Sequence, residues 1–161
     1  MTHTRRLSHV GLTVGDLDVS LAFWRDQVGL RELGRGMADW EYLDRIVGLD
    51  GTQIEWAELE LPGEAFLELF SYVQPPAAPL PPGGMNRPGM VHICLEVDDI
   101  VQVAQRLEAA GYTPRSSEVV TIPDGAYQGF KDIYFSDPDG FTLELSERPA
   151  GPPAARSEPT A

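Results

Sequence analysis

Short stretches of alternating hydrophobic and polar residues recur along the chain. Near the start, Val10, Leu12 and Val14 alternate with less hydrophobic neighbours, a period of two that is typical of a half-buried strand. Similar alternation, or a short apolar run, predicts further strands over residues 53–61, 65–72, 91–97, 119–122, 131–136 and 141–146. The turn-forming run Asp137-Pro-Asp-Gly140 separates the last two of them.

Two segments have the spacing of an amphipathic helix instead. Apolar residues recur at helical intervals over 21–28 and over 100–107. Each segment follows aspartates that can cap a helix N-terminus and precedes a glycine that can end it. These residues are Asp16 or Asp18 with Gly29, and Asp98 or Asp99 with Gly111.

The second half of the chain repeats the first. Residues 90–100 (MVHICLEVDDI) match residues 7–17 (LSHVGLTVGDL) at an offset of 83 positions, which sets His92 on His9. A second pair of similar segments lies near the end of each half, FLELF at 66–70 and FTLEL at 141–145. The repeat predicts two βαβββ modules, about 7–73 and 90–147. We expect them to pair into a cup-shaped mixed sheet, in one α+β domain over residues 1–147.

Four stretches interrupt these patterns. Residues 34–51 are irregular and are expected to separate the second and third strands of the first module, with a possible short helix over 40–47. Residues 74–89 contain six prolines and are predicted to be the linker between the modules. The glycine-containing run 123–129 is either a flap or a plain turn, and residues 148–161 are expected to form a disordered tail.

Charge limits the possible partners. The net charge is −13, and between His9 and Glu147 the chain carries 24 acidic against 8 basic residues. Such a body repels a phosphate backbone, so we expect no nucleic acid partner and favour a metal cation or a small molecule. The apolar runs are too short for a membrane span, and the polar start is unlike a signal peptide, which predicts a cytoplasmic protein. The single cysteine, Cys94, excludes an internal disulfide.

Strand periodicity also picks out a set of metal ligands. In each of four predicted strands, apolar residues occupy one face and leave a His or a Glu on the other. These residues are His9, Glu68, His92 and Glu144, one His and one Glu per module. A single such residue is usually a solvated polar group, but four at equivalent repeat positions favour a metal site. Two imidazoles and two carboxylates suit one divalent ion of Zn, Ni, Co, Mn or Fe.

Other side chains are predicted on the same faces as these ligands. They either line a substrate pocket or belong to ordinary packing. They are Trp56, Phe66, Phe70, Cys94 and Tyr134.

The motifs LSHVGLTV, FLEL, VHICLEVDD and DPDGFTLEL resemble those of the vicinal oxygen chelate superfamily. That superfamily includes glyoxalase I, methylmalonyl-CoA epimerase, extradiol dioxygenases, fosfomycin-resistance enzymes and bleomycin-binding proteins. The resemblance implies metal ligands at His9, Glu68, His92 and Glu144, a set that looks like that of bacterial glyoxalase I. Dioxygenases of the group use two His and one Glu, so a fourth ligand at Glu68 counts against that activity.

The resemblance implies a metal-dependent lyase or isomerase that removes a proton beside a chelated carbonyl. By analogy with glyoxalase I, the catalytic base is Glu144, with Glu68 as second choice. An antibiotic-binding resistance protein without catalysis is the alternative, and an Fe(II) dioxygenase is third. We expect a homodimer, as is common in the family.

An anionic thiol cofactor such as glutathione or coenzyme A has little support from charge. The candidate cations for it are few in so acidic a chain. They are Arg31, Arg35, Arg45, Arg87 and Lys131.

Overall fold

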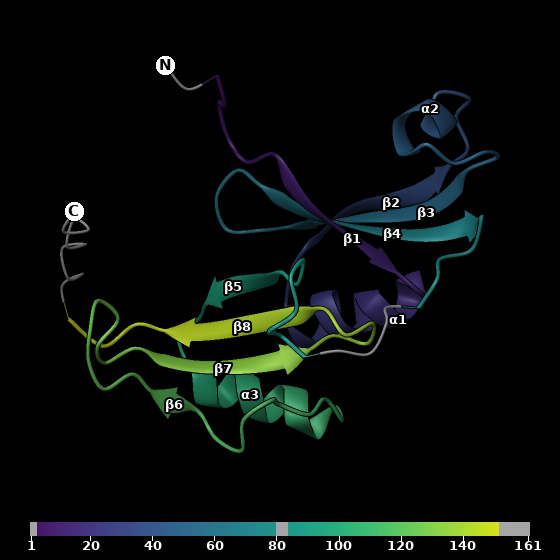
Figure 1. Ribbon diagram of the computed structural model, residues 1–161. Coiled ribbons are helices and arrows are strands. Elements are labelled where there is room, and N and C mark those ends of the chain that lie inside the picture. The colour runs from purple at the N-terminus through teal and green to yellow at the C-terminus, as the bar shows by residue number, and fades with distance from the viewer. Residues whose placement is uncertain (1–2, 80–83, 152–161) are drawn as a thin grey trace. The chain divides into compact units, whose positions relative to one another are not determined.

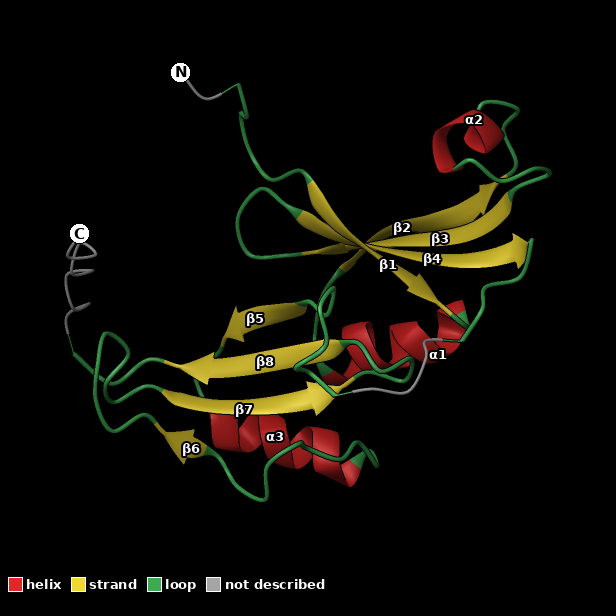
Figure 2. Ribbon diagram, in the orientation of Figure 1, coloured by secondary structure: helices red, strands yellow, loops and turns green. Residues whose placement is uncertain are grey.

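The computed structural model shows the same order of strands twice (Figure 1). It describes residues 3–79 and 84–151, and the chain divides into two units, Met1–Gly83 and Gly84–Ala161. Each unit contains one four-stranded mixed sheet together with helices, so the predicted α+β class and the twofold use of βαβββ are confirmed (Figure 2).

The first unit runs in the order strand, helix, then three strands. Its elements are β1 (His9–Val14), α1 (Leu17–Leu21), the π-helical turn η1 (Ala22–Gln27), β2 (Glu32–Ala38), α2 (Leu43–Val47), β3 (Gln53–Glu60) and β4 (Phe66–Gln74). The sheet order is β1-β4-β3-β2, in which β1 is parallel to β4 and the other pairs are antiparallel.

The second unit has the same topology. Its elements are β5 (His92–Glu96), α3 (Ile100–Ala109), β6 (Val120–Thr121), β7 (Lys131–Ser136) and β8 (Thr142–Glu147). The sheet order is β5-β8-β7-β6, again with the first strand parallel to the last. In the described part of the chain, none of the helices has the length and apolarity needed to span a membrane.

One face of each sheet is hydrophobic and is covered by helix. In the second unit α3 turns Ile100, Ala104 and Leu107 inward, and it lies along β7 and β8 (Figure 1). The inward side chains of these strands, such as Leu143 and Leu145, are fully buried. Removing this apolar surface from water stabilises each layer by roughly 25 cal/mol per Å².

The first unit buries an equivalent layer. Leu67 and Leu69 on β4 are fully buried, as are Phe23 and Trp24 on η1, whose rings meet edge to face with centroids 5.1 Å apart. The helical segment predicted after Asp16 or Asp18 is present, but only its first part is α-helical, and it continues as the π-helical turn η1. Asp16 is the residue that caps it, accepting the Val19 N–H at 3.0 Å.

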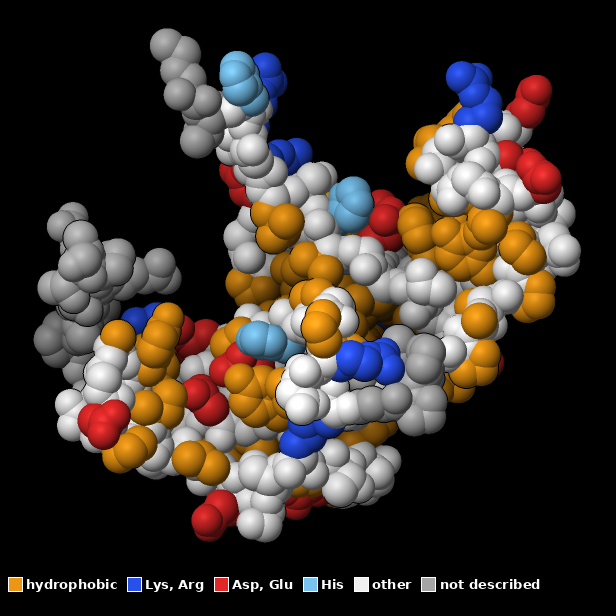
Figure 3. Space-filling view, in the orientation of Figure 1, with side chains coloured by type: hydrophobic (Ala, Val, Ile, Leu, Met, Phe, Trp, Pro, Cys, Tyr) orange, Lys and Arg blue, Asp and Glu red, His pale blue; other side chains and the backbone are white. Residues whose placement is uncertain are grey.

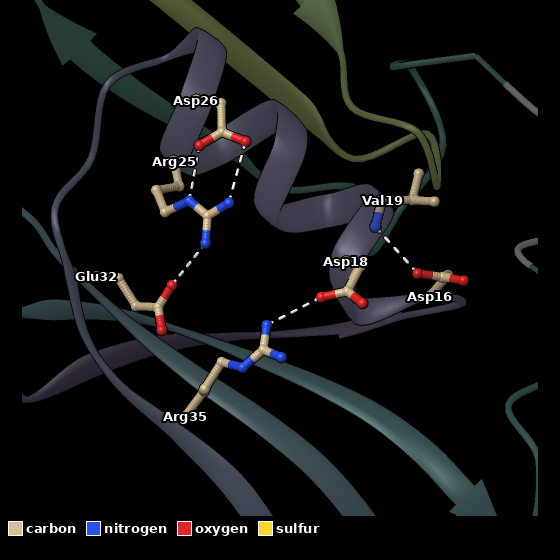
Figure 4. A network of polar contacts seen from close by, with 7 residues as sticks. All are labelled: Asp16, Asp18, Val19, Arg25, Asp26, Glu32 and Arg35. Carbon is tan, nitrogen blue, oxygen red and sulfur yellow. Dashed lines mark hydrogen bonds and ion pairs between the residues drawn. The ribbon is translucent and has the colours of Figure 1, made fainter.

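Ion pairs tie this helical layer to strand β2 (Figure 4). Arg25 of η1 donates to Glu32 at 2.8 Å and to its neighbour Asp26 at 2.7 Å. Arg35 of β2 donates to Asp18 of α1 at 2.9 Å. All these side chains are partly exposed, so they fix the position of β2 more than they add to stability.

Strand β2 corrects one prediction from the sequence. Residues 34–51 were expected to be irregular, yet the strand runs from Glu32 to Ala38 and pairs with β3 along its length. Most of its side chains are exposed and two are glycines, so it lacks the alternation that marks a half-buried strand. The short helix expected within 40–47 is confirmed as α2. Residues 80–83 of the predicted linker and 152–161 of the predicted tail lie outside the described residues.

Glu147 joins three elements of the second unit. Its carboxylate accepts the Ile100 N–H at the start of α3 at 2.8 Å and binds Lys131 Nζ of β7 at 2.5 Å. Asp99 caps the same helix by accepting the Gln102 N–H at 2.9 Å. The Lys131 ammonium, and after it the Ile100 amide, hold the pKa of Glu147 below its ordinary value.

We predict that Glu147→Gln lowers the free energy of unfolding by about 1–2 kcal/mol at pH 7, because charged hydrogen bonds to α3 and β7 are lost. Since the pKa is depressed in the folded state, this stabilisation is present above the unfolded pKa near ~4.3 and is lost as pH falls through the folded value. Thermal unfolding from pH 7 to pH 3 measures it. The exposed Glu118, changed to Gln, is the matched control. A difference between Glu147→Gln and wild type that persists undiminished at pH 3 would contradict this role.

Candidate functional site

A histidine and a glutamate meet on the open face of the first sheet. His9 begins β1, and Glu68 lies on the parallel neighbour β4, directly opposite Gly11. The His9 Nε2 and Glu68 Oε2 atoms are 3.6 Å apart. The Phe66 ring lies beside the imidazole, with ring centroids 5.1 Å apart.

The second sheet repeats this pair. His92 begins β5, and Glu144 lies on the parallel neighbour β8, directly opposite Cys94. The His92 Nε2 and Glu144 Oε2 atoms are 3.0 Å apart. In both units the imidazole is about half exposed and the carboxylate is mostly buried, with exposed side-chain fractions of 45% and 18% in the first pair and 49% and 14% in the second. Figure 3 shows histidines at the surface with acidic side chains beside them.

The sequence pattern explains this placement. Buried Leu67 and Leu69 flank Glu68, and buried Leu143 and Leu145 flank Glu144, so the alternation of the strand turns each carboxylate away from the helix. Within each unit, the structure therefore places the His and the Glu on the sheet face that the sequence predicts.

The two glutamates have different neighbours. Glu58 of β3 stands opposite Glu68. Burial raises the pKa of Glu68, and the like charge of Glu58 adds to the rise, while His9 opposes it. The equivalent neighbour of Glu144 in the second unit is Tyr134 of β7.

Glu144 lies among hydrogen-bond donors. The Tyr134 hydroxyl and the Cys94 thiol both hydrogen-bond to its carboxylate. Burial, followed by the Glu144 charge, raises the pKa of Tyr134 to about 12. Partial burial of the thiol, followed by the charges of Glu144 and Asp132, raises the pKa of Cys94 to about 12. Both groups therefore stay protonated at neutral pH and act as donors to Glu144.

A pocket of about 740 Å³ opens over this face of the second sheet. His92, Cys94 and Glu144 line it, so two predicted ligands and one predicted pocket residue share a cavity. The segment before β7 supplies Tyr127 and Phe130, whose rings meet edge to face with centroids 5.6 Å apart. Asp132 and Arg148 also line the pocket, and neither was among the pocket residues expected from the sequence.

A signal for two of these residues was present in the sequence. The glycine-containing run 123–129, which the sequence indicates to be a flap or a turn, contributes Tyr127 to the pocket. Asp132 shares the parity of Tyr134 on β7 and could have been found by the same alternation. Arg148 lies at the start of the segment predicted to be a disordered tail, where no pattern marked it.

The predicted aromatic residues of the first unit lie where parity placed them. Trp56 stands opposite Phe70 and shares the face of Glu68. The Trp56 ring also lies below Gly36 of β2, where an added Cβ would come within 3.1 Å of it. A cavity of about 430 Å³ in this unit is lined by other residues, including Asp18, Arg35 and Glu55, and by none of the predicted aromatic side chains or metal ligands.

The separation of the His and Glu atoms in each pair can be compared with that of two ligands of one metal ion. Ligand atoms lie about 2.1 Å from a first-row ion, so neighbouring ligands are separated by roughly 3.0–3.4 Å at octahedral or tetrahedral angles. The 3.0 Å separation of His92 and Glu144 lies in this range, and the 3.6 Å separation of His9 and Glu68 lies slightly above it. Within the described residues, no three His, Cys, Asp or Glu side chains gather closely enough to hold an ion. Each unit thus presents one half of the predicted ligand set.

One protein family and several known proteins are similar in sequence to this chain. The profile of the Glyoxalase/Bleomycin resistance protein/Dioxygenase superfamily matches residues 6–145. A 2-epi-5-epi-valiolone epimerase of Actinomyces sp. is 32% identical over 149 residues, which cover 90% of this chain and 80% of that protein. A lactoylglutathione lyase of Salmonella typhimurium is 30% identical over 145 residues, covering 88% of this chain and 92% of that protein.

A solved structure shares the fold. A glyoxalase family protein from Bacillus cereus superposes with a TM-score of 0.79 at 22% identity, covering 93% of this chain and 99% of its own. At that identity the likeness concerns the fold.

The surroundings of Cys94 generate a prediction about its reactivity. Iodoacetamide should modify it at pH 8 in EDTA at least about tenfold more slowly than a free thiol, because the thiolate is the nucleophile and the raised pKa suppresses it. Glu144→Gln removes the nearest negative charge and should speed the reaction, whereas Glu118→Gln should not. Mass spectrometry of the alkylated chain gives the rates. Modification of wild type as fast as that of a free thiol would contradict the assignment.

Proposed function

The chain belongs to the Glyoxalase/Bleomycin resistance protein/Dioxygenase superfamily, and on that premise we propose that it is a metal-dependent lyase or isomerase. Its reaction removes a proton from the carbon beside a carbonyl of a small oxygenated substrate. The relatives named as an epimerase and as a lactoylglutathione lyase support this class of chemistry.

The observation that carries the proposal is the repeated His–Glu pair. His9 with Glu68, and His92 with Glu144, occupy the same register in equivalent sheets. These four residues would hold one divalent ion per site, and elemental analysis identifies which of Zn, Ni, Co, Mn and Fe it is. Because each unit offers only two ligands, a complete site would combine one His9–Glu68 pair with one His92–Glu144 pair. A homodimer with two such sites is the assembly that we propose.

When bound, the ion supplies Lewis acidity that polarises a carbonyl oxygen and makes the neighbouring C–H more acidic, worth several kcal/mol. The side chains do the rest. Glu144 accepts the proton and returns it to the substrate. The His92 Nε2 atom lies 3.0 Å from Glu144 Oε2, so the imidazole would hold the ion beside this carboxylate. The Tyr134 and Cys94 donors fix its direction.

Glu68 is the second candidate for the base. Its pKa is raised by burial and by Glu58, so its carboxylate binds a proton more readily than an ordinary glutamate. We assign the proton to Glu144 and a ligand role to Glu68, and deuterium exchange in a Glu144→Gln variant tests that assignment directly.

We predict about one divalent ion per chain in protein purified without chelator, measured by elemental analysis. His92→Ala should lose most of this metal, because a neutral imidazole ligand is removed. His3→Ala, at an exposed histidine outside both pairs, is the matched control and should keep it. Absence of metal from wild type, with no added ion raising the unfolding temperature, would favour the antibiotic-binding alternative.

We predict that Glu144→Gln retains most of the metal but slows proton exchange by at least ~100-fold, because the amide keeps a ligand oxygen and loses basicity. Solvent deuterium incorporation into 2-hydroxy-carbonyl compounds, followed by NMR, measures the rate. Glu118→Gln should exchange at the wild-type rate. Undiminished exchange in Glu144→Gln would transfer the base to Glu68. Oxygen consumption with Fe(II) in place of exchange would indicate a dioxygenase.

A further inference from the structure

Two glycines of strand β2 are not explained by its backbone. Gly34 and Gly36 lie within this strand, and neither has the positive φ that favours glycine. A glycine inside a strand weakens it, because it has no side chain to pack and loses more conformational freedom on folding than other residues. The reason for these glycines therefore lies in the space that their missing side chains leave on the face of the sheet.

The Trp56 ring occupies that space. Trp56 of β3 stands opposite Gly36. A Cβ added at Gly36 would lie 3.1 Å from the indole Cζ2 atom and 3.3 Å from Cε2 and Nε1, and one added at Gly34 would lie 3.8 Å from Cη2 and Cζ3. The indole thus extends along β2 against both glycines, with one side seated on the strand. This seat fixes the orientation of the ring, because a side chain at position 36 would push against it.

The seated ring belongs to an aromatic row beside the candidate metal ligand Glu68. The aromatic row consists of Trp56 and, directly opposite it on β4, Phe70. The neighbouring row on the same sheet face carries Glu58 opposite Glu68. Successive residues on one face of a strand are roughly 7 Å apart, so the aromatic row lies one step from the ligand. Both rings are half-buried, which leaves part of each open above the sheet.

The neighbouring carboxylates argue against a protein surface as the cover of this face. In the described part of the chain, neither Glu58 nor Glu68 pairs with a lysine or arginine, and the ion-pair partner of Glu68 is His9. A protein surface packed over the aromatic row would also take these carboxylates out of water, which is costly unless they are paired. A small molecule can cover the rings alone, while the ion of the proposed function compensates the carboxylates.

The side chains around the aromatic row favour a flat apolar group over a hydroxylated one. The row itself ends at Gly36 on β2 and at Thr13 on β1, and the row beyond it, away from the ligand, pairs Ile54 with Tyr72. The hydroxyl groups of a polyol would find few hydrogen-bond partners here. A planar ring can lie in full contact with a fixed indole, and stacked aromatic rings gain more than the area that they bury.

We propose that the aromatic row binds an aryl group of the substrate, so that the substrate is an aryl-substituted 2-hydroxy-carbonyl compound. The inference rests on the proposed function, since it takes the carbonyl end of the substrate to lie at the ion beside Glu68. It makes Trp56 a residue that determines specificity, with no part in proton transfer. Gly36 is a positioning residue that acts through the Trp56 ring.

Three neutral 2-hydroxy ketones test the substrate class. They are 2-hydroxyacetophenone, which carries a phenyl group, its cyclohexyl analogue, which carries a saturated ring of similar size, and hydroxyacetone, which carries a methyl group. In calorimetry with metal-loaded protein, the phenyl compound should bind at least about tenfold more tightly than hydroxyacetone and about threefold more tightly than the cyclohexyl compound. Equal or tighter binding of the cyclohexyl compound would overturn the inference, as would equal binding of the phenyl and methyl compounds.

Trp56→Leu tests the residue. Leucine keeps an apolar side chain but has no flat face, so the affinity for 2-hydroxyacetophenone should fall at least about fivefold and the preference over hydroxyacetone should shrink with it. Met37→Ala is the matched control, because Met37 stands opposite Glu55 and so lies on the other face of β2, where it is exposed. It should keep the phenyl preference. An equal loss of affinity for both ketones in Trp56→Leu would indicate a purely structural role and overturn the inference.

Two further measurements keep the test valid if Trp56→Leu does not fold. Gly36→Ala pushes against the indole and should reduce the phenyl preference at least about threefold, whereas Gly34→Ala, whose Cβ stays 3.8 Å from the ring, should keep it. In a Trp40→Phe background the other remaining tryptophan, Trp24, is fully buried. There 2-hydroxyacetophenone should quench the emission of Trp56 more strongly than hydroxyacetone does. No difference in quenching would show that something else, such as a second copy of the chain, covers the aromatic row, and would overturn the inference.

The outcomes separate this inference from the proposed function. Trp56-dependent binding of 2-hydroxyacetophenone by protein that holds no metal and exchanges no deuterium would overturn the proposed function and support the aryl site. Metal-dependent exchange in hydroxyacetone as fast as in 2-hydroxyacetophenone, with no phenyl preference in binding, would support the proposed function and overturn the aryl site.

Discussion

Parallel pairing of the first and last strands in each unit is the constraint on which the candidate site depends. In both sheets the residue two places after the histidine stands opposite the glutamate, Gly11 opposite Glu68 and Cys94 opposite Glu144. This diagonal arrangement places the histidine Nε2 and glutamate Oε2 atoms 3.6 Å apart in the first unit and 3.0 Å apart in the second. A slip of one residue in either pairing would turn the glutamate toward the helix and expose its leucine neighbours. Chemistry and folding therefore depend on the same register.

The hydrophobic layer and the helix caps keep that register in place. Burial of Leu67, Leu69, Leu143 and Leu145 makes the alternative facing of β4 and β8 unfavourable by several kcal/mol. Glu147 is the last residue of β8, the strand that carries the candidate base, and it links the start of α3 to β7. The site-bearing end of β8 is thus anchored to the helical layer.

The two units repeat one topology but differ in chemistry. The position beside the ligand glutamate holds Glu58 in the first unit and Tyr134 in the second. The position on its other side holds Gly11 in the first unit and Cys94 in the second. A like charge therefore neighbours Glu68, whereas donors neighbour Glu144. The pocket with aromatic and acidic walls lies over the second sheet.

The sequence by itself determined the α+β class, the repeated βαβββ order and the outward facing of His9, Glu68, His92 and Glu144, because alternation and repetition are local properties of the chain. It did not place strand β2 correctly and left residues 34–51 irregular, because the exposed residues and glycines of this strand carry no periodic signal and only pairing with β3 makes it a strand. Nor could it show that the Oδ1 atom of Asp132 is buried without a hydrogen-bond partner among the described residues, or that Arg148 is engaged by Glu96. Only the tertiary structure decided these points, because a hydrogen bond between residues 52 positions apart depends on which strands become neighbours.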